Sequence, residues 1–190
     1  EVLRESGPPH EPLVQFGAMS AIPHADAGPT ELRRGDMVLF DLGANVEGYL
    51  SDITRMTVFG DATPEMKEIY RVVLAAQQAA IAVVRPGVPC QDVDRAARRV
   101  IQEAGYGEYF THRTGHGIGM DIHEAPWLVE GNASPLVAGN VITIEPGIYL
   151  PGRFGVRIDG LAVLPMLRRD VPDSRILILT MHDDVNYLQQ

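Results

Sequence analysis

The 190-residue sequence predicts an α+β domain in which helices cover one face of a mainly antiparallel sheet. Three observations support this fold class. Two strand-like segments come first and resemble a hairpin, two helix-like segments follow, and a series of short strand-like runs comes last. An apolar fraction of 45% is typical of a globular protein, and the length suits one substantial hydrophobic core.

The first predicted feature is a hairpin whose two arms each carry an aspartate. Met37 to Leu42 is a buried-strand pattern that contains Asp41, residues 43–48 form the connection, and Tyr49 to Phe59 alternates as a second strand that contains Asp52. Two aspartates inside adjacent strands are costly to bury without a counter-charge. We therefore expect a positive group between them.

Two helices are predicted next. The segment Thr63-Pro64-Glu65 combines a capping hydroxyl, a proline in the first turn and an acidic residue, and the helix then runs to Val84. A second helix spans Cys90 to Ala104, with apolar side chains at helical spacing and Gly105 as its stop. We expect Cys90 to pack in the interior rather than to act as a nucleophile.

Short strand-like runs then complete the predicted sheet. They span residues 141–144, 147–150, 156–158, 161–164 and 176–179. Since these runs follow the helices in sequence and lie close to one another, hairpins are the expected connections.

Composition limits the classes of function. The net charge of −9, from 25 acidic and 16 basic residues, disfavours binding to nucleic acid. The sequence contains no run of about 18 uninterrupted apolar residues, which argues against a membrane span. The single cysteine cannot form an internal disulfide, so we expect a cytoplasmic protein.

The segment from Thr111 to Glu124 is rich in histidine and glycine, and it contains His112, His116 and His123. Glycines around His116 allow the backbone to approach a ligand closely. In a straight strand His116 and His123 would face opposite sides, so we expect a turn or bulge that reorients one of them. The alternative is a polar loop with incidental histidines.

Three further positions allow two interpretations each. Glu145 ends an apolar strand before Pro-Gly, and is either a solvated turn residue or a ligand aimed into a cleft. Arg157 and Asp159 share one face of a strand, where a structural ion pair between strands is the alternative to a site. Trp127 either packs at the margin of the cleft or forms a platform for substrate.

Taken together, the candidate ligands supply four carboxylates and one imidazole; they are Asp41, Asp52, His116, Glu145 and Asp159. Such a hard, oxygen-rich set suits two adjacent divalent cations, because carboxylates can bridge metals and offset their charge. Cations of this kind convert bound water into a nucleophile at neutral pH. The sequence therefore indicates a hydrolase.

In this order the motifs resemble the pita-bread metallopeptidases, which include methionine aminopeptidase, aminopeptidase P and prolidase. The resemblance covers residues 23–164. Asp41-Leu42-Gly43 and residues 51–55 match the two aspartate motifs of the proline-directed members. The segments 112–116 and 121–124 are more similar to prolidase and aminopeptidase P than to methionine aminopeptidase. Prolidase, an Xaa-Pro dipeptidase, is the nearest member.

The resemblance implies a pita-bread (creatinase/aminopeptidase-like) fold, with helices on the outer face of a curved, mainly antiparallel sheet. It also implies a dinuclear peptidase that hydrolyses Xaa-Pro bonds through a metal-bridging hydroxide. The implied cofactors are two divalent ions, with Mn²⁺ as first choice and Co²⁺ or Zn²⁺ as alternatives. The implied partners are a peptide with proline in second position and a second copy in a homodimer. Residues 1–190 are expected to form one catalytic domain that lacks the family's first helices and usual N-terminal domain.

The resemblance also assigns roles by matching position. It makes metal ligands of Asp41, Asp52, His116, Glu145 and Asp159. It makes catalytic residues of His24, His123 and Glu145. It places His112, Tyr149 and Arg157 around the substrate or behind the ligands.

One position departs from the family pattern, and two alternative functions remain. The family has Gly-Val-Arg-Ile-Glu-Asp, whereas this chain has Asp159 followed by Gly160, so the bridging acid is one methylene shorter. Metal sites are sensitive to small displacements. Either Gly160 lets the backbone move inward and compensates for the shorter acid, or the metal site is weaker or altered. The alternatives are a non-catalytic pita-bread module that binds peptides or proteins, and a metal-free relative acting on creatine-like substrates. Neither needs the full carboxylate set.

Overall fold

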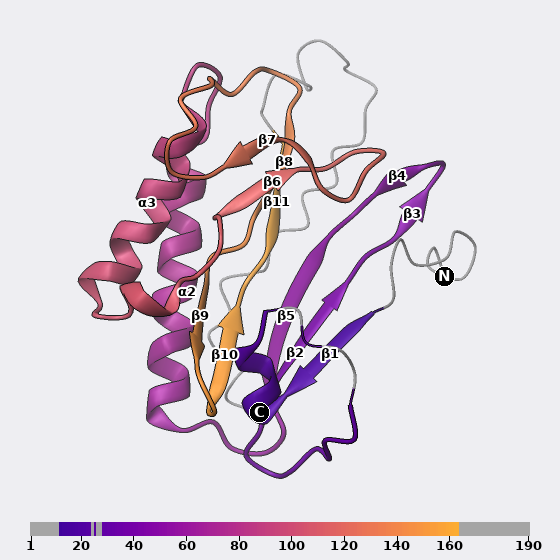
Figure 1. Cartoon of the computed structure of the whole chain (residues 1–190), viewed down its shortest axis with the longest axis vertical. Coiled ribbons are helices and arrows are strands. Elements are labelled where there is room, and N and C mark those ends of the chain that lie inside the picture. The colour runs from indigo at the N-terminus through magenta and orange to yellow at the C-terminus, as the bar shows by residue number, and fades with distance from the viewer. Residues whose placement is uncertain (1–11, 24, 26–27, 164–190) are drawn as a thin grey trace.

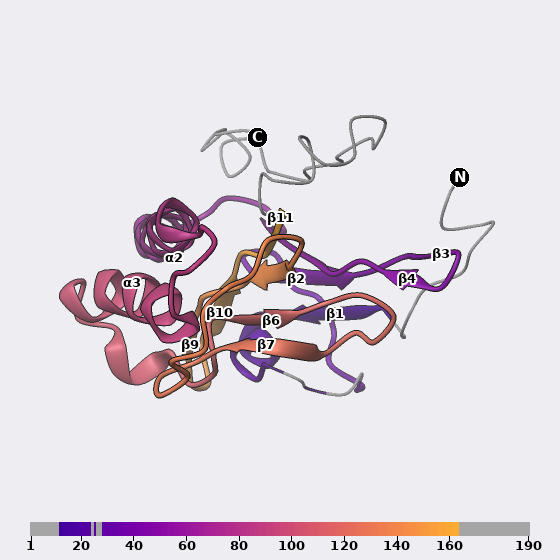
Figure 2. The same cartoon turned by 90° about the horizontal axis from the view of Figure 1, so that it is seen from above.

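The computed structural model describes residues 12–163, apart from residues 24, 26 and 27. Its two long helices, α2 (Pro64–Val83) and α3 (Cys90–Glu103), lie side by side and to one side of the strands (Figures 1 and 2). Every strand pairing among the described residues is antiparallel. The predicted arrangement, with helices on one face of a mainly antiparallel sheet, is confirmed.

The strands form two larger sheets and two small hairpins. The three-stranded sheet has the order β1-β2-β5, and these strands are Leu13–Phe16, Met37–Leu42 and Ile53–Val58. The four-stranded sheet has the order β11-β8-β6-β7, and these strands are Gly160–Val163, Val141–Ile144, Gly115–Gly117 and Glu124–Leu128. The hairpins are β3 (Asn45–Val46) with β4 (Tyr49–Leu50), and β9 (Gly147–Leu150) with β10 (Phe154–Arg157). Two short 3-10 helices are η1 (Gly17–Ala21) and η2 (Gly107–Tyr109).

The hairpin predicted around the two aspartates is present, but its second arm is interrupted. β2 pairs with β5, while the segment predicted as one strand divides into β4 and β5 at Ser51 and Asp52. The backbone N–H of Ser51 donates to the carbonyl of Ala44 at 2.9 Å, and the Ser51 hydroxyl accepts from the N–H of Ala44 at 3.0 Å. These bonds close the base of the β3-β4 hairpin. Asp52 therefore lies in the break between two strands, and the prediction that it lies inside a strand was wrong.

Other strand boundaries also differ from the predictions. The strand predicted at 156–158 is β10, which begins at Phe154 and ends at Arg157, so Asp159 lies between β10 and β11. The strand predicted at 176–179 lies outside the described residues. β1, β6 and β7 were not predicted as strands, because β1 lies in a region rich in proline and glycine and β6 is three residues long.

The two helices follow the predicted start and stop signals. The Thr63 hydroxyl accepts a hydrogen bond from the N–H of Met66 at 3.2 Å, which satisfies a free donor in the first turn of α2. Gly105 follows α3 with φ of +85°, a conformation that favours glycine. Each helix ends one residue before its predicted end.

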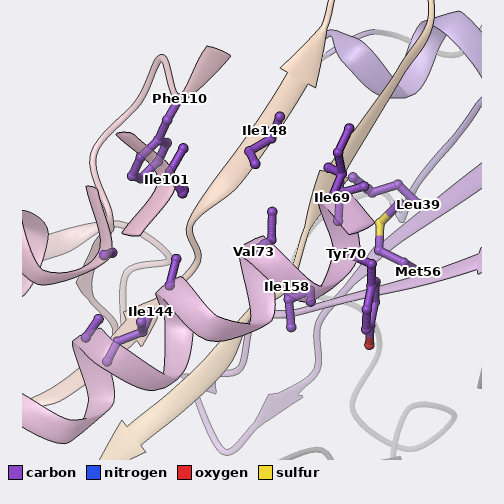
Figure 3. Close-up of a cluster of buried hydrophobic side chains, with 14 of the residues drawn as sticks. Leu39, Met56, Ile69, Tyr70, Val73, Ile101, Phe110, Ile144, Ile148 and Ile158 are labelled. Carbon is purple, nitrogen blue, oxygen red and sulfur yellow. The ribbon is translucent and has the colours of Figure 1, made fainter. Parts of the chain in front are cut away.

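The hydrophobic core lies between α2, α3 and the strands. Ile69, Tyr70 and Val73 of α2 belong to the same buried cluster as the strand residues Leu39 and Ile148 (Figure 3). Removing such side chains from water is the main stabilising contribution to a fold of this size.

Cys90 is fully buried in this cluster, as predicted for a packing residue. Burial raises the pKa of its thiol, which disfavours the nucleophilic thiolate. Within the described residues, no helix has the length and apolar character needed to cross a bilayer.

Candidate metal centre

The strand ends bring the predicted acidic ligands to one place. Asp41 lies near the end of β2, and Asp52 lies directly before β5, the strand that pairs with β2. Glu145 follows β8 and Asp159 precedes β11, and the pairing of Gly160 with Ile144 puts these two acids at the same end of their sheet. Backbone geometry therefore assembles a set that is scattered over more than 100 residues of sequence.

His116 joins these acids from β6, the strand next to β8. Its Nε2 lies 3.1 Å from Oε1 of Glu145 and 3.8 Å from Oδ2 of Asp52. Its Nδ1 lies 2.9 Å from the carbonyl oxygen of Gly117. Because a carbonyl can only accept, Nδ1 carries the hydrogen and the other nitrogen faces the acids.

The bulge expected after His116 is present. The register of β6 against β7 shifts between His116 and Gly117. The ring of His123 then comes back beside that of His116, with centroids 4.5 Å apart and the rings edge to face. This confirms the prediction that an irregularity reorients one of the two histidines, and it brings their rings into contact.

Crowding of the carboxylates changes their protonation. Burial raises the pKa of Asp52 to about 7, with further contributions from the negative charges of Asp41 and Glu145. Burial, Glu145 and Asp52 likewise raise the pKa of Asp159 well above the usual range. For Glu145, burial acts in the same direction, but His116 and Arg157 outweigh it and lower the pKa to about 2. The protein on its own therefore does not supply enough positive charge for all the acids.

The donor chemistry fits divalent cations. Four buried side-chain atoms at this centre have no hydrogen-bond partner, namely Oδ1 of Asp41, Nε2 of His116, and both Oδ atoms of Asp159. Buried carboxylate oxygens without a partner are costly, and hard oxygen donors are the ligands that divalent cations prefer. Within the described part of the chain, no three His, Cys, Asp or Glu side chains already converge on a single point as ligands. The side chains would therefore have to close in to hold an ion.

Arg157 supplies a positive charge beside Asp41, one of the two hairpin aspartates that were expected to have a positive group between them. It is buried, its Nη2 donates to Oδ2 of Asp41, and its Nε donates to the hydroxyl of Thr54 at 3.0 Å. Burial would lower the pKa of this guanidinium, but Tyr149 and Asp41 outweigh that effect and raise it. Arg157 of β10 thus forms an ion pair with Asp41 of β2, which agrees with the alternative interpretation of an ion pair between strands.

His112 and Tyr149 form a hydrogen-bonded pair beside the centre. Nδ1 of His112 lies 2.7 Å from the carbonyl oxygen of Arg113, so Nδ1 carries the hydrogen. Nε2 then accepts from the Tyr149 hydroxyl at 2.8 Å. Burial raises the pKa of Tyr149 to about 12, which keeps the phenol protonated as this donor. His24 lies outside the described residues.

A cavity of about 270 Å³ opens on the centre, and its lining consists of His112, Arg113, His123, Glu145 and Arg157. Four of these were predicted as site residues from the sequence. Arg113 was not predicted as a site residue. Its position between His112 and His116, two residues of the motif, could have indicated a role for this cation at the site.

A glutamine of α2 also reaches the centre and was not predicted. The buried Nε2 of Gln77 donates to the carbonyl of Ile144 at 3.2 Å and to that of Ile158 at 3.1 Å. These residues directly precede Glu145 and Asp159. One amide group from the helix layer therefore fixes the two strand ends that carry these acids.

Replacing Gln77 by leucine is expected to lower the free energy of unfolding by about 1–3 kcal/mol, because two buried carbonyls lose their donor. Gln78→Leu is the matched control, since Gln78 is the next residue of α2 and is exposed. Denaturant titration of the two variants measures the difference. Equal stability of the two variants would contradict this role of Gln77.

These features, a sheet core with outer helices and an acidic centre that opens on a small cavity, define a candidate metal-dependent hydrolase. The chain belongs to metallopeptidase family M24, whose model matches residues 3–164, and it has the pita-bread fold of that family.

Individual relatives agree with this assignment. The chain is 50% identical over 147 residues to an uncharacterized peptidase of Staphylococcus aureus, an alignment that covers 77% of the chain and 42% of the relative. A prolidase structure from Thermococcus sibiricus is similar with a TM-score of 0.83 and 46% identity, over 86% of this chain and 45% of that one. An X-Pro aminopeptidase structure from Thermotoga maritima is similar with a TM-score of 0.81 and 44% identity, over 83% of this chain and 45% of that one. The chain thus spans less than half the length of these relatives.

Proposed function

We propose that this chain is the catalytic part of a metal-dependent peptidase that hydrolyses Xaa-Pro bonds, of the Xaa-Pro dipeptidase or Xaa-Pro aminopeptidase type. The observation that carries the proposal is the set of buried carboxylate oxygens of Asp41 and Asp159 that have no hydrogen-bond partner, at a centre that opens on a cavity. The names of the similar prolidase and X-Pro aminopeptidase structures support the choice of proline peptides.

In this proposal two divalent cations are held by Asp41, Asp52, His116, Glu145 and Asp159. Mn²⁺ is our first choice because the set is rich in carboxylates, with Co²⁺ or Zn²⁺ as alternatives. When bound, the cations supply an activated water and polarise the scissile carbonyl. Asp159 is shorter than the glutamate expected from the family pattern, so its reach depends on the strand end that Gln77 fixes.

The remaining residues of the cavity orient the substrate and move protons. Glu145 projects into the cavity beside His116 and is the group proposed to accept a proton from the attacking water. His123 lines the same cavity and is proposed to donate toward the oxygen that gains charge in the tetrahedral intermediate. His112, held by Tyr149, is proposed to contact the substrate, and His24 keeps its proposed role on the substrate side.

The test is hydrolysis by protein that has been stripped with a chelator and then reloaded with Mn²⁺. Ala-Pro and Ala-Pro-Ala are the substrates and Ala-Ala is the control peptide. We expect turnover of at least one proline peptide, at roughly 1–10³ s⁻¹, and none in the presence of chelator. Elemental analysis of the same preparation gives the metal content. Bound manganese without cleavage of either proline peptide would overturn the proposal, and protein that binds no metal would favour the non-catalytic module.

A further inference from the structure

One wall of the cavity carries a positive charge that the described residues do not neutralise. Arg157 also lines the cavity, but it is already paired with Asp41. The Nε of Arg113 is buried without a hydrogen-bond partner, and no described carboxylate lies within ion-pair distance of the guanidinium. In a chain of net charge −9, an uncompensated cation inside a cavity requires an explanation.

Arg113 is held in place by an aromatic ring. Its guanidinium carbon lies 4.7 Å from the centroid of Trp127, a distance typical of a cation–π contact. Trp127 lies in β7, directly opposite His116 of β6, so the ring that supports Arg113 is fixed next to the candidate metal centre. The backbone of Arg113 is fixed as well, because its carbonyl accepts from His112 at 2.7 Å.

A guanidinium held against a ring still has its planar edge of N–H donors available. That edge matches a carboxylate, which it can bind with two parallel hydrogen bonds. The cavity volume of about 270 Å³ lies below the roughly 300–1,000 Å³ of sites for drug-sized ligands, so its dimensions suit a small molecule. The acids at the centre repel a carboxylate, and Arg113 is the lining arginine that is not paired with a described acid.

We propose that Arg113, supported by Trp127, binds the free C-terminal carboxylate of a dipeptide and makes the chain select dipeptides over longer peptides. This inference rests on the proposed function and names its substrate class. A peptide that continues beyond the second residue has an amide instead of a carboxylate at this point, and an amide cannot form the charged pair. One charge-assisted hydrogen-bonded pair should favour the free carboxylate over the amide by a factor of about 10 to 100.

The experiment compares Ala-Pro with its C-terminal amide, using manganese-loaded wild-type protein and two variants. In wild type, kcat/KM should be about 10- to 100-fold higher for the free dipeptide. In Arg113→Gln, kcat/KM for Ala-Pro should fall by that factor, mainly because KM rises. Its kcat/KM for the amide should stay within about twofold of the wild-type value. Arg113→Lys should recover part of the preference. Arg99→Gln, at an exposed arginine of α3, is the control and should match wild type on both peptides.

A binding measurement separates this inference from the proposed function. Calorimetry with L-proline and L-prolinamide reports carboxylate recognition without hydrolysis, so it remains decisive even if wild-type protein cleaves neither peptide. Wild type should bind proline more tightly than prolinamide, and Arg113→Gln should bind both alike. Two results would overturn the inference: equal or undetectable binding of both ligands by wild type, or an equal loss of both activities in Arg113→Gln.

Discussion

An Asp52→Asn variant is expected to lose peptidase activity by about a thousandfold or more, while its metal-free form becomes more stable than the wild type above neutral pH. Asp52 is buried, and its Oδ2 lies 3.8 Å from Nε2 of His116 at the candidate metal centre. Asparagine keeps the shape of the side chain and removes its negative charge. If the centre needs this negative charge to bind cations, the variant should lose metal binding and activity. Because the same charge destabilises the metal-free fold, the metal-free variant should be more stable.

The sign of the stability change follows from protonation. Burial, with Asp41 and Glu145, raises the pKa of Asp52 from 3.8 to about 7 in the metal-free protein. Between these values the folded protein holds more protons than the unfolded chain, so the free energy of unfolding falls as the pH rises from about 4 to about 7. Asparagine does not titrate, so the variant avoids this loss. We expect the metal-free variant to exceed the wild type by roughly 1–3 kcal/mol at pH 8, and the difference to vanish near pH 4.

Thermal unfolding with and without Mn²⁺ at pH 5 and pH 8 measures these changes, and hydrolysis of Ala-Pro measures the activity. Added manganese should raise the melting temperature of the wild type more than that of the variant, and more at pH 8 than at pH 5, since ligands must be deprotonated. Asp61→Asn is the control, because Asp61 lies on the surface with its side chain 98% exposed. A manganese shift of equal size in wild type and Asp52→Asn would contradict the role of Asp52.

Elements whose signals are local could be predicted from the sequence. The start of α2 follows from the hydroxyl of Thr63 and the proline after it, and the end of α3 follows from Gly105. The hairpin that carries Asp41 follows from its apolar run and alternation. The positions of the candidate ligands were predicted because the motifs fix them relative to the strand ends, and the structure brings Asp52, His116 and Glu145 together.

Contacts between distant segments could not be predicted in this way. Gln77 lies 67 residues from Ile144 and 81 residues from Ile158 in sequence, and nothing in the helical period shows which backbone carbonyls its amide will meet. The break at Ser51 depends on a hydroxyl that competes with strand pairing, a choice that alternation of apolar residues does not reveal. The pairing of Arg157 with Asp41 spans 116 residues and likewise appears only once the strands are packed.

Replacing Asp94 by alanine is expected to produce the largest loss of stability among these variants, about 3–5 kcal/mol, because it breaks a buried ion pair and leaves a charge behind. Asp94 is fully buried on α3, and its carboxylate accepts from Arg98 at 2.9 and 3.0 Å. It also accepts from the N–H of Thr114 at 3.0 Å and from the hydroxyl of Thr114 at 2.8 Å.

The effect should extend to the candidate metal centre. Arg98 donates onward to the carbonyls of Phe110 at 3.0 Å and His112 at 2.9 Å, and its guanidinium lies over the Phe110 ring at 4.2 Å. Asp94 and Arg98 together therefore fix the chain from Phe110 to Thr114, which leads directly into the strand that carries His116. Loss of Asp94 should consequently weaken binding of manganese as well as folding.

Denaturant titration of four proteins tests this account: wild type, Asp94→Ala, Arg98→Ala and the double variant. If the two side chains act as one unit, the double variant should be less destabilised than the sum of the single variants. Arg95→Ala is the matched control, because Arg95 lies on the same helix as Asp94 and forms an exposed pair with Glu130, and exposed pairs contribute little. An Asp94→Ala variant as stable as Arg95→Ala, or strictly additive effects in the cycle, would show that the chain before His116 is held by other contacts.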